Sequence, residues 1–282
     1  MPRILAVLAL AWLTGVACTA PPRAARQAAT PLIDVWTRGL AAFGVFVPSE
    51  QPRRDADGNR RPPHYTIDGA ERLGRDPLLD YLFLNLEGAY DAAAVDTLVA
   101  GLARVSAEDR PTLLVRIPPI ERDGEQAARS RVHDALTRGA DGIVLPHIRS
   151  PEEARVAVRF FHEAGADVWS PSNPDGRIIA MLMIEDPGAL EAAQAIAETP
   201  GYSVLSCGIG SLSGALGGDR DAGEAAAEVV LGHATRVGMP SMMTANRANM
   251  IHRVEQGYLG LLLQMGDDTA ETIQLGRAAA GR

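Results

Sequence analysis

Eight short apolar segments alternate along this chain with segments of helical pattern or with long loops. The clearest is 178–184, in which seven apolar residues lead directly into two acids, Glu185 and Asp186. Unbroken apolar runs of this length are typical of strands buried on both faces, and strands separated by helices pair in parallel. The other segments that we predict as strands are 42–47, 80–85, 112–117, 141–146, 202–210, 240–245 and 258–264.

Eight strand–helix units predict a closed (β/α)8 barrel, or TIM barrel, with an open doubly wound sheet as the alternative. The helix that begins at Ser150 has the strongest local signals, because Ser150 and Glu153 form a capping box and Gly165 follows its end. Segment 48–61 is polar, and we expect a surface loop there. The segments of helical pattern are 31–40, 92–105, 125–138, 150–165, 222–237, 246–256 and 268–280.

The composition is that of one large folded domain. Of the 282 residues, 46% are hydrophobic and 22% are charged, so we expect a single barrel domain over 31–282. The formal net charge is −8 without a long basic run, which argues against binding to nucleic acid or to an anionic membrane surface. The two cysteines, Cys18 and Cys207, support neither a disulfide framework nor a cysteine-based zinc site.

Residues 1–18 are predicted to be a signal peptide rather than part of the fold. A basic residue precedes an apolar stretch at 4–13, which is too short to span a membrane comfortably. The residues before Cys18 resemble a bacterial lipobox, so we predict lipidation of Cys18, with 19–30 as a linker. The protein would then be exported, as a periplasmic or membrane-anchored lipoprotein. Secretion after cleavage behind Ala20, or retention of the segment as an anchor, are the alternatives.

Function in such a barrel lies at the carboxyl ends of the strands. Glu185 ends an apolar run, and a carboxylate there needs a cation or water, because burial of an unpaired charge is costly. We interpret Glu185 as a metal ligand; the alternative is an acid that is solvated or paired with an arginine. Asp186 precedes Pro187 and a helical pattern, so we interpret it as a helix N-cap rather than a second ligand.

Other polar groups are expected near the same strand ends. Arg116 lies in an otherwise apolar strand and needs an anion, so we predict an oxyanion or carboxylate clamp, with a salt bridge to Glu87 or Glu185 as the alternative. Of the six histidines, His147 is the one placed to face a site. The glycine-rich turn at 208–212 offers consecutive backbone N–H groups, which can bind carboxylate or phosphate.

Four segments, taken in order, are similar to one known family. They are LVRIPP at 114–119, GADGIVLPHIRSPEEA at 139–154, MIED at 183–186 and GIGSLSGALG at 208–217. Together they resemble the HpcH/HpaI aldolase/citrate lyase family. The resemblance implies a barrel of the phosphoenolpyruvate/pyruvate type and a homo-oligomer such as a trimer or hexamer. It also implies chemistry on a C–C bond next to a 2-oxo acid or acyl-CoA, with Mg²⁺ or Mn²⁺.

The resemblance further implies roles for individual residues. Glu185 matches the family's metal-binding glutamate, and Arg116 matches the arginine that stabilises the enolate oxygen. Backbone N–H groups of Gly210 and Ser211 match those that hold the substrate carboxylate. In the family pattern G-x-x-D-L-S, however, Ser211 stands where an aspartate is the second metal ligand, so we expect Ser211 to be a weak ligand.

A second departure from the family follows the second predicted strand. The family pattern D-x-E-H-G reads Asn85-Leu-Glu87-Gly88 here, so the histidine used for acid–base work is missing. Two hypotheses result. The first is a metal-assisted C–C lyase acting through the enolate of a small 2-oxo acid, with Glu87, His147 or metal-bound water as the base. The second is a catalytically inactive envelope protein that binds a small carboxylate or serves as a scaffold.

Overall fold

The computed structural model describes residues 31–282 with the exception of residues 53 and 60. The predicted signal peptide, the linker and the predicted lipidation site at Cys18 lie outside the described residues. Within the described part of the chain, none of the helices is both long enough and apolar enough to cross a membrane.

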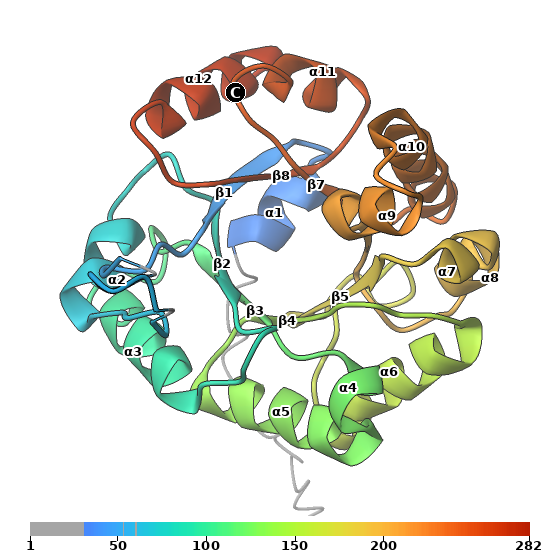
Figure 1. Ribbon diagram of the computed structural model, residues 1–282, viewed down its shortest axis with the longest axis horizontal. Helices are drawn as coiled ribbons and strands as arrows, with labels where there is room; N and C mark the ends of the chain where they lie inside the picture. The colour runs from blue at the N-terminus through green and yellow to red at the C-terminus, as the bar shows by residue number, and fades with distance from the viewer. Residues whose placement is uncertain (1–30, 53, 60) are drawn as a thin grey trace, which may run out of the picture.

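Eight parallel strands form a nearly closed barrel, and Figure 1 shows the helices as a ring around them. The pairing runs from β6 through β5, β4, β3, β2, β1 and β8 to β7. The (β/α)8 barrel predicted from the sequence is confirmed, and the open sheet is wrong. The strands are β1 (Ala42–Phe46), β2 (Tyr81–Asn85), β3 (Thr112–Arg116), β4 (Gly142–Leu145), β5 (Ile179–Ile184), β6 (Val204–Cys207), β7 (Met242–Thr244) and β8 (Gly260–Leu263).

The barrel closes between β6 and β7 through a side chain. Among the described residues, no ladder of backbone hydrogen bonds joins these two strands. Instead, Ser206 Oγ on β6 accepts a hydrogen bond from the backbone N–H of Met242 on β7, at 2.9 Å. Ser206 is 1% exposed, so water cannot readily replace its hydroxyl. At this seam a hydrogen bond to a side chain thus takes the place of a backbone ladder.

The described chain has twelve helices. The predicted N-cap of α6 is confirmed, because Ser150 Oγ accepts a hydrogen bond from Glu153 N–H at 3.2 Å. The helices are α1 (Pro31–Thr37), α2 (Ile67–Gly74), α3 (Ala92–Leu102), α4 (Ile120–Asp123), α5 (Glu125–Arg138), α6 (Pro151–Glu163), α7 (Pro187–Glu191), α8 (Ala193–Ala197), α9 (Ile209–Ala215), α10 (Arg220–Arg236), α11 (Met250–Glu255) and α12 (Thr269–Ala279).

Three helices, α2, α4 and α9, differ from the sequence prediction. The helix α2 was not predicted, and its start is fixed by side chains: Thr66 Oγ1 accepts from Gly69 N–H at 3.0 Å and donates to Glu50 of the preceding loop. The helix α9 replaces the predicted glycine-rich turn. Its first hydrogen bond runs from Leu212 N–H to the carbonyl of Gly208, at 3.0 Å. The chain thus turns directly from β6 into a helix.

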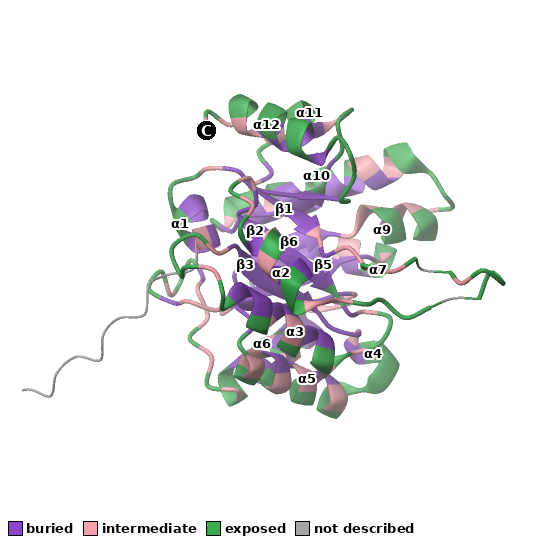
Figure 2. Ribbon diagram, turned by 90° about the vertical axis from the view of Figure 1, so that its left-hand side faces the viewer, coloured by how far each residue is buried: buried purple, intermediate pink, exposed green. Residues whose placement is uncertain are grey.

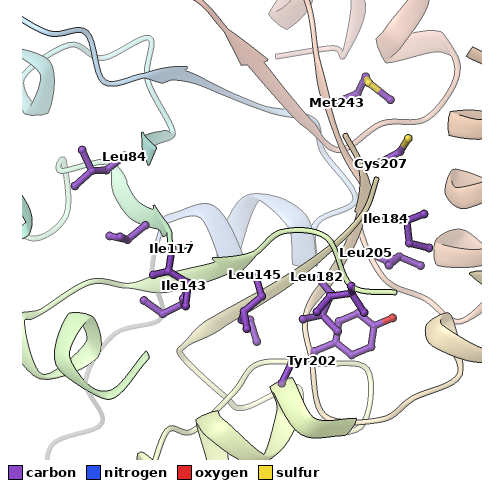
Figure 3. Packing of buried hydrophobic residues seen from close by; sticks show 14 of the residues in the cluster. Leu84, Ile117, Ile143, Leu145, Leu182, Ile184, Tyr202, Leu205, Cys207 and Met243 are labelled. Carbon is purple, nitrogen blue, oxygen red and sulfur yellow. The ribbon is translucent and has the colours of Figure 1, made fainter. Parts of the chain in front are cut away.

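The apolar core has two parts, one on each face of the sheet. Figure 2 shows the strands buried in the centre and the helices with exposed outer faces. Residues between the strands and the helices form the larger part, and Leu84, Ile143 and Leu205 in Figure 3 belong to it. Inward-pointing residues such as Tyr81 and Leu114 fill the barrel itself. Successive strand residues point to opposite faces, so the strands supply both parts.

The helix α1 closes the end of the barrel at which the strands begin. Leu32 N–H donates to Thr112 Oγ1, at the start of β3, and Trp36 Nε1 donates to the carbonyl of Leu259, just before β8, at 3.3 and 2.7 Å. The Trp36 ring stacks on Trp169 with 5.9 Å between the ring centroids. The loops that follow the strands lie at the opposite end.

Two buried acids brace this amino-terminal end. The carboxylate of Asp80 accepts hydrogen bonds from a backbone N–H of β1 and from Arg282, each at 2.8 Å. The carboxylate of Asp141 accepts from a backbone N–H of β3 at 2.8 Å and from Arg110 at 2.7 and 2.9 Å. Each acid thereby ties the start of its own strand to the neighbouring strand.

Candidate active site

Four charged or titratable side chains meet where β2 to β5 end. Arg116 is the last residue of β3, while Glu87, His147 and Glu185 lie in the loops just after β2, β4 and β5. Arg116 Nη2 lies 2.8 Å from Glu87 Oε1 and 2.8 Å from Glu185 Oε2. The structure therefore brings together four residues that were selected individually from the sequence. We call these four residues the mouth cluster.

Arg116 and Glu185 form a pair that is almost closed to water, with side chains 10% and 2% exposed. Arg116 Nη2 donates to both carboxylate oxygens, at 3.0 and 2.8 Å. Burial of either charge alone would be costly, so each requires the other. The salt bridge considered for Arg116 thus forms with Glu87 and with Glu185. Arg116 Nε is also buried and lacks a hydrogen-bond partner among the described residues.

His147 has an unusual backbone conformation. Its φ is 53°, in the left-handed region that residues other than glycine seldom adopt, at a cost of about 1–3 kcal/mol. In this conformation its N–H donates to Glu185 Oε2 at 3.2 Å, and its Nε2 lies 3.2 Å from Glu87 Oε1. The hydrogen bond with Glu87 raises the pKa of His147 to about 8; burial opposes this change, and the charge of Glu185 adds to it.

Glu87 lies in the loop that lacks the family's histidine. Asn85 Oδ1 accepts from Glu87 N–H at 3.2 Å, and Arg122 Nη1 donates to the carbonyls of Glu87 and Gly88 at 2.8 and 3.0 Å. Burial opposes ionisation of Glu87. The hydrogen bond with His147 and the nearby guanidinium charges outweigh that effect, so the pKa of Glu87 lies below its usual value. Glu87 is therefore an anion at neutral pH.

Asp186 is the N-cap residue of α7, but its side chain does not cap the helix. Its Oδ2 lies 3.5 Å from His147 Nδ1 and, although buried, has no hydrogen-bond partner among the described residues. The predicted position of Asp186 is confirmed and the predicted role of its side chain is wrong. The physical reason is that the carboxylate lies against the imidazole rather than against the first N–H groups of α7.

A cavity of about 280 Å³ lies beside the mouth cluster, and we call it the first cavity. Arg116, Glu185, Gly210 and Ser211 supply polar groups to its lining. A small molecule that enters can reach both the buried arginine and the buried acid. Most of the remaining lining is apolar and includes Phe46, Phe83, Met181, Met183, Met242 and Leu262.

Gly208 and α9 shape the polar side of the first cavity. A Cβ atom at position 208 would overlap the Glu185 carboxylate, so a larger residue there would displace Glu185 from its present position. The backbone N–H groups of Gly210 and Ser211 belong to the first turn of α9, where N–H groups have no acceptor within the helix. Both residues line the cavity, so these groups are available to an acceptor from outside the protein.

The donor set suits a divalent cation. Ligand atoms of Glu87, His147 and Glu185 all lie within 4.8 Å of one another. Together with Asp186, three carboxylates face one guanidinium and one imidazole, so the cluster is negative overall even when the imidazole is protonated. Carboxylates and imidazole are common ligands of divalent ions. The unpartnered carboxylate oxygen of Asp186 gives further capacity for a cation or its water.

Glu185 and Ser211 were predicted as ligands from the sequence, whereas the structure groups Glu185 with Glu87 and His147. The signal for this grouping was present, because each of the three follows one of the neighbouring strands β2, β4 and β5. Ser211 lines the same cavity from α9. Its role as a ligand stays a prediction.

Cys207, the last residue of β6, also lines the first cavity. Burial raises the pKa of its thiol to about 12, and the charge of Glu185 adds to the effect. The nucleophilic form of cysteine is the thiolate, so this thiol is unreactive at neutral pH. Covalent chemistry at Cys207 is therefore not part of the site.

Fold and site together define a (β/α)8 barrel that presents buried acids and an arginine to a cavity at the carboxyl ends of its strands. The family model for HpcH/HpaI aldolase/citrate lyase matches residues 77–275. The chain belongs to this family, which confirms the resemblance found in the sequence.

The curated relatives are named as aldolases. Over 167 residues, the chain is 30% identical to 4-hydroxy-4-methyl-2-oxoglutarate aldolase cghB of Chaetomium globosum and 29% identical to 4-hydroxy-4-methyl-2-oxoglutarate aldolase tasA of Hapsidospora irregularis. Each match covers 52% of this chain and 61% of the relative. The chain thus spans less than two thirds of the length of these relatives.

Solved structures share the barrel. A HpcH/HpaI aldolase/citrate lyase family protein from Burkholderia cenocepacia has a TM-score of 0.65 at 22% identity, covering 89% of this chain and 97% of that chain. The citrate lyase beta subunit from M. tuberculosis, complexed with oxaloacetate and magnesium, has a TM-score of 0.56 at 16% identity, covering 87% and 99%. At these identities the likeness concerns the fold.

Proposed function

We propose that the protein is a metal-assisted C–C lyase that acts through the enolate of a small 2-oxo acid such as pyruvate. One observation carries the proposal: Arg116 and Glu185 meet at the carboxyl ends of the strands, beside a cavity that a small molecule can enter. Membership of the HpcH/HpaI aldolase/citrate lyase family supports the reaction class.

In this proposal the protein binds the 2-oxo acid through two groups, its carboxylate and its carbonyl oxygen. The carboxylate of the 2-oxo acid accepts hydrogen bonds from the N–H groups of Gly210 and Ser211. The Arg116 guanidinium, which lines the first cavity, donates to the oxygen on which negative charge develops. A donor fixed in a buried site stabilises such charge without reorganising, which is the usual source of large rate effects.

Glu87, His147 and Glu185 are the residues that would hold a divalent ion, Mg²⁺ or Mn²⁺, with Ser211 as a weaker candidate. When bound, such an ion supplies positive charge that polarises the carbonyl of the 2-oxo acid. The Arg116 guanidinium already neutralises part of the carboxylate charge, so the protein can keep Glu185 buried before any cation binds.

Proton transfer is assigned to whichever of Glu87 and His147 does not bind the ion, because a lone pair that binds a metal cannot also accept a proton. Without an ion, Glu87 Oε1 and His147 Nε2 lie 3.2 Å apart. Loss of an acid–base group costs on the order of 10²–10⁴ in rate, so the missing histidine at Gly88 needs a substitute. His147 supplies an imidazole at the same mouth, from β4 instead of β2.

The second candidate function is an inactive barrel that binds a small carboxylate or acts as a scaffold. It is favoured by the contacts of Glu185, whose carboxylate already accepts from Arg116 and from His147 N–H, and by a serine at position 211 where the family has aspartate. Under this hypothesis the Arg116–Glu185 pair is permanent, and added metal has no effect on the protein.

A titration with Mn²⁺ in the presence of pyruvate separates these hypotheses, alongside an assay for pyruvate release from 4-hydroxy-4-methyl-2-oxoglutarate. We expect binding and turnover in the unmodified protein and loss of both in Glu185→Gln. The matched control is Glu191→Gln, which removes the same charge from an exposed position on α7. No binding at millimolar Mn²⁺ and no turnover in the unmodified protein would contradict the lyase and favour the inactive barrel.

We also propose export as a lipoprotein through Cys18, and assembly into a trimer or hexamer. The export proposal is supported by the apolar stretch at 4–13 and by the lipobox-like residues before Cys18. The variant Cys18→Ala should move the protein from the membrane fraction to the soluble fraction. Recovery of the unmodified protein in the soluble fraction would contradict the lipid anchor, and light scattering of the purified protein tests the oligomer.

A further inference from the structure

The loop between β2 and α3 carries Glu87, a member of the mouth cluster, and is held at both ends. At its start, Leu86 N–H donates to the carbonyl of Arg116 on β3, at 2.9 Å. At its end, the Tyr90 hydroxyl donates to a carboxylate on α5, at 2.7 Å. Gly88 lies between these points; it is exposed, and a Cβ atom there would have no neighbour within 4 Å. Packing therefore does not hold the middle of the loop.

Arg122 of α4 holds the middle of this loop by its backbone. Its Nη1 donates to the carbonyls of Glu87 and Gly88, at 2.8 and 3.0 Å, so one nitrogen fixes two successive peptide groups. The carbonyl of Glu87 thus contacts α4, while its carboxylate lies 2.8 Å from Arg116 Nη2 and 3.2 Å from His147 Nε2. A rotation of these peptide groups would move the carboxylate away from the mouth cluster.

The guanidinium of Arg122 is itself held in place by an acid. Its Nε and Nη2 donate to the carboxylate of Asp123, at 3.3 and 3.1 Å, and Arg131 Nη1 on α5 lies 2.6 Å from the same carboxylate. Contacts therefore run from α5 through Asp123 and Arg122 to the backbone of the loop. In the described part of the chain, no hydrogen bond or ion pair joins Arg122 or Asp123 to a side chain of the mouth cluster.

We propose that Arg122 is a positioning residue of the lyase, which holds Glu87 where its carboxylate can bind the divalent ion or accept a proton. This inference rests on the proposed function. Arg122 contacts neither of the groups expected to bind the 2-oxo acid, so it acts through Glu87 alone. Residues that orient a metal ligand commonly contribute about 10–100-fold to metal affinity or activity.

The charge of Arg122 and its positioning role have opposite effects on a cation. A guanidinium near a metal site repels the ion, so loss of the charge alone would strengthen the binding of Mn²⁺. Loss of the hydrogen bonds to the loop would instead weaken binding, because Glu87 is one of the three residues that would hold the ion. The sign of the change in affinity therefore separates the two roles.

Calorimetric titration with Mn²⁺ in the presence of pyruvate tests the positioning role. We expect Arg122→Ala to bind Mn²⁺ about tenfold more weakly than the unmodified protein. Arg122→Lys should bind it almost as well, because lysine keeps both the charge and a donor for the two carbonyls. The matched control is Arg38→Ala, which removes an arginine that donates to a backbone carbonyl of α1. The Arg122 side chain is 40% exposed, so its variants should stay folded, which circular dichroism checks.

A second variant tests whether the contacts act in series. Asp123→Asn should weaken Mn²⁺ binding in the unmodified protein and have no further effect in Arg122→Ala, because Asp123 acts through Arg122. An equal change in both backgrounds would contradict this series of contacts. In steady-state kinetics Arg122→Ala should lower kcat about tenfold and leave KM almost unchanged, since the N–H groups expected to bind the substrate carboxylate belong to α9.

Binding of Mn²⁺ that is unchanged or stronger in Arg122→Ala would overturn the positioning role and leave the proposed lyase intact. A loss of the same size in Arg38→Ala would also overturn it, because the effect would then not be specific to the loop. If the unmodified protein neither binds Mn²⁺ nor turns over substrate, the lyase assignment fails, and the positioning role fails with it.

Discussion

The acids at the two ends of the barrel have different partners. At the amino-terminal end, each of Asp80 and Asp141 is held by an arginine and by a backbone N–H of the neighbouring strand. At the carboxyl-terminal end, Glu87 and Glu185 share one guanidinium, and a cavity lies beside it. An acid with complete partners stabilises a fold, whereas an acid that faces a cavity can bind something else.

The largest effect is expected from Arg116→Ala, which removes the shared guanidinium. Turnover should fall on the order of 10²–10³, the usual cost of losing one donor to a developing oxyanion. Steady-state kinetics with 4-hydroxy-4-methyl-2-oxoglutarate measures the change, and the circular dichroism spectrum shows whether the barrel is retained. Unchanged turnover in a folded variant would remove Arg116 from the proposed reaction.

The matching change at the other end is Arg110→Ala, which leaves Asp141 buried with its backbone donor but without its guanidinium. The free energy of unfolding should fall by about 3 kcal/mol, as it does when a buried pair is broken. Urea denaturation gives this value, and kcat of the folded protein should stay as it was. A loss of kcat without a loss of stability would contradict the stabilising role that we assign to the acids at the amino-terminal end.

A smaller effect, an increase in metal affinity, is expected from Ser211→Asp, which places at position 211 the carboxylate that the family has there. Affinity for Mn²⁺ should rise about tenfold or more, because an added anionic ligand strengthens binding of a hard cation. Calorimetry against the unmodified protein measures it, with Ser213→Asp on the same helix as the control. An equal rise in both variants would show a general charge effect rather than a ligand at position 211.

The smallest effect is expected at Glu224, which lies at the carboxyl-terminal end of the barrel and forms an ion pair with Arg253. The hydrogen bond from Arg253 holds the pKa of Glu224 below its usual value of 4.5, and burial opposes this change. Because the pKa is lower in the folded state, the pair stabilises the fold above the unfolded-state pKa. That contribution disappears as pH falls through the folded-state pKa.

Glu224→Gln should therefore lose about 1 kcal/mol of stability at pH 7 and less at pH 3. Urea denaturation at the two pH values, with Glu255→Gln as the control, tests this. A loss of the same size at both pH values would mean that packing, and not ionisation, is responsible.

The sequence allowed the strands and most helices to be predicted, because apolar runs such as 178–184 depend on burial on both faces of a sheet. The helix α2 was missed because its start depends on the side chain of Glu50, which lies 16 residues before Thr66. The helix α9 was missed because its glycines favour a turn by local preference, and packing overrides that preference.

The residues of the site could be selected from the sequence one by one, but their contacts could not. That Arg116 reaches both Glu87 and Glu185 depends on the tilt and register of three strands. The left-handed backbone of His147 is unfavourable locally and persists because its N–H and imidazole both find carboxylates.

The stacked rings of Trp36 and Trp169 determine what intrinsic fluorescence can report for this protein. The sequence has three tryptophans, and the third, Trp12, belongs to the segment predicted to be removed on export. The emission of a processed chain would then come from the amino-terminal end of the barrel, opposite the first cavity. Such a signal would follow global melting closely, and titrations of small ligands would need calorimetry or an added dye.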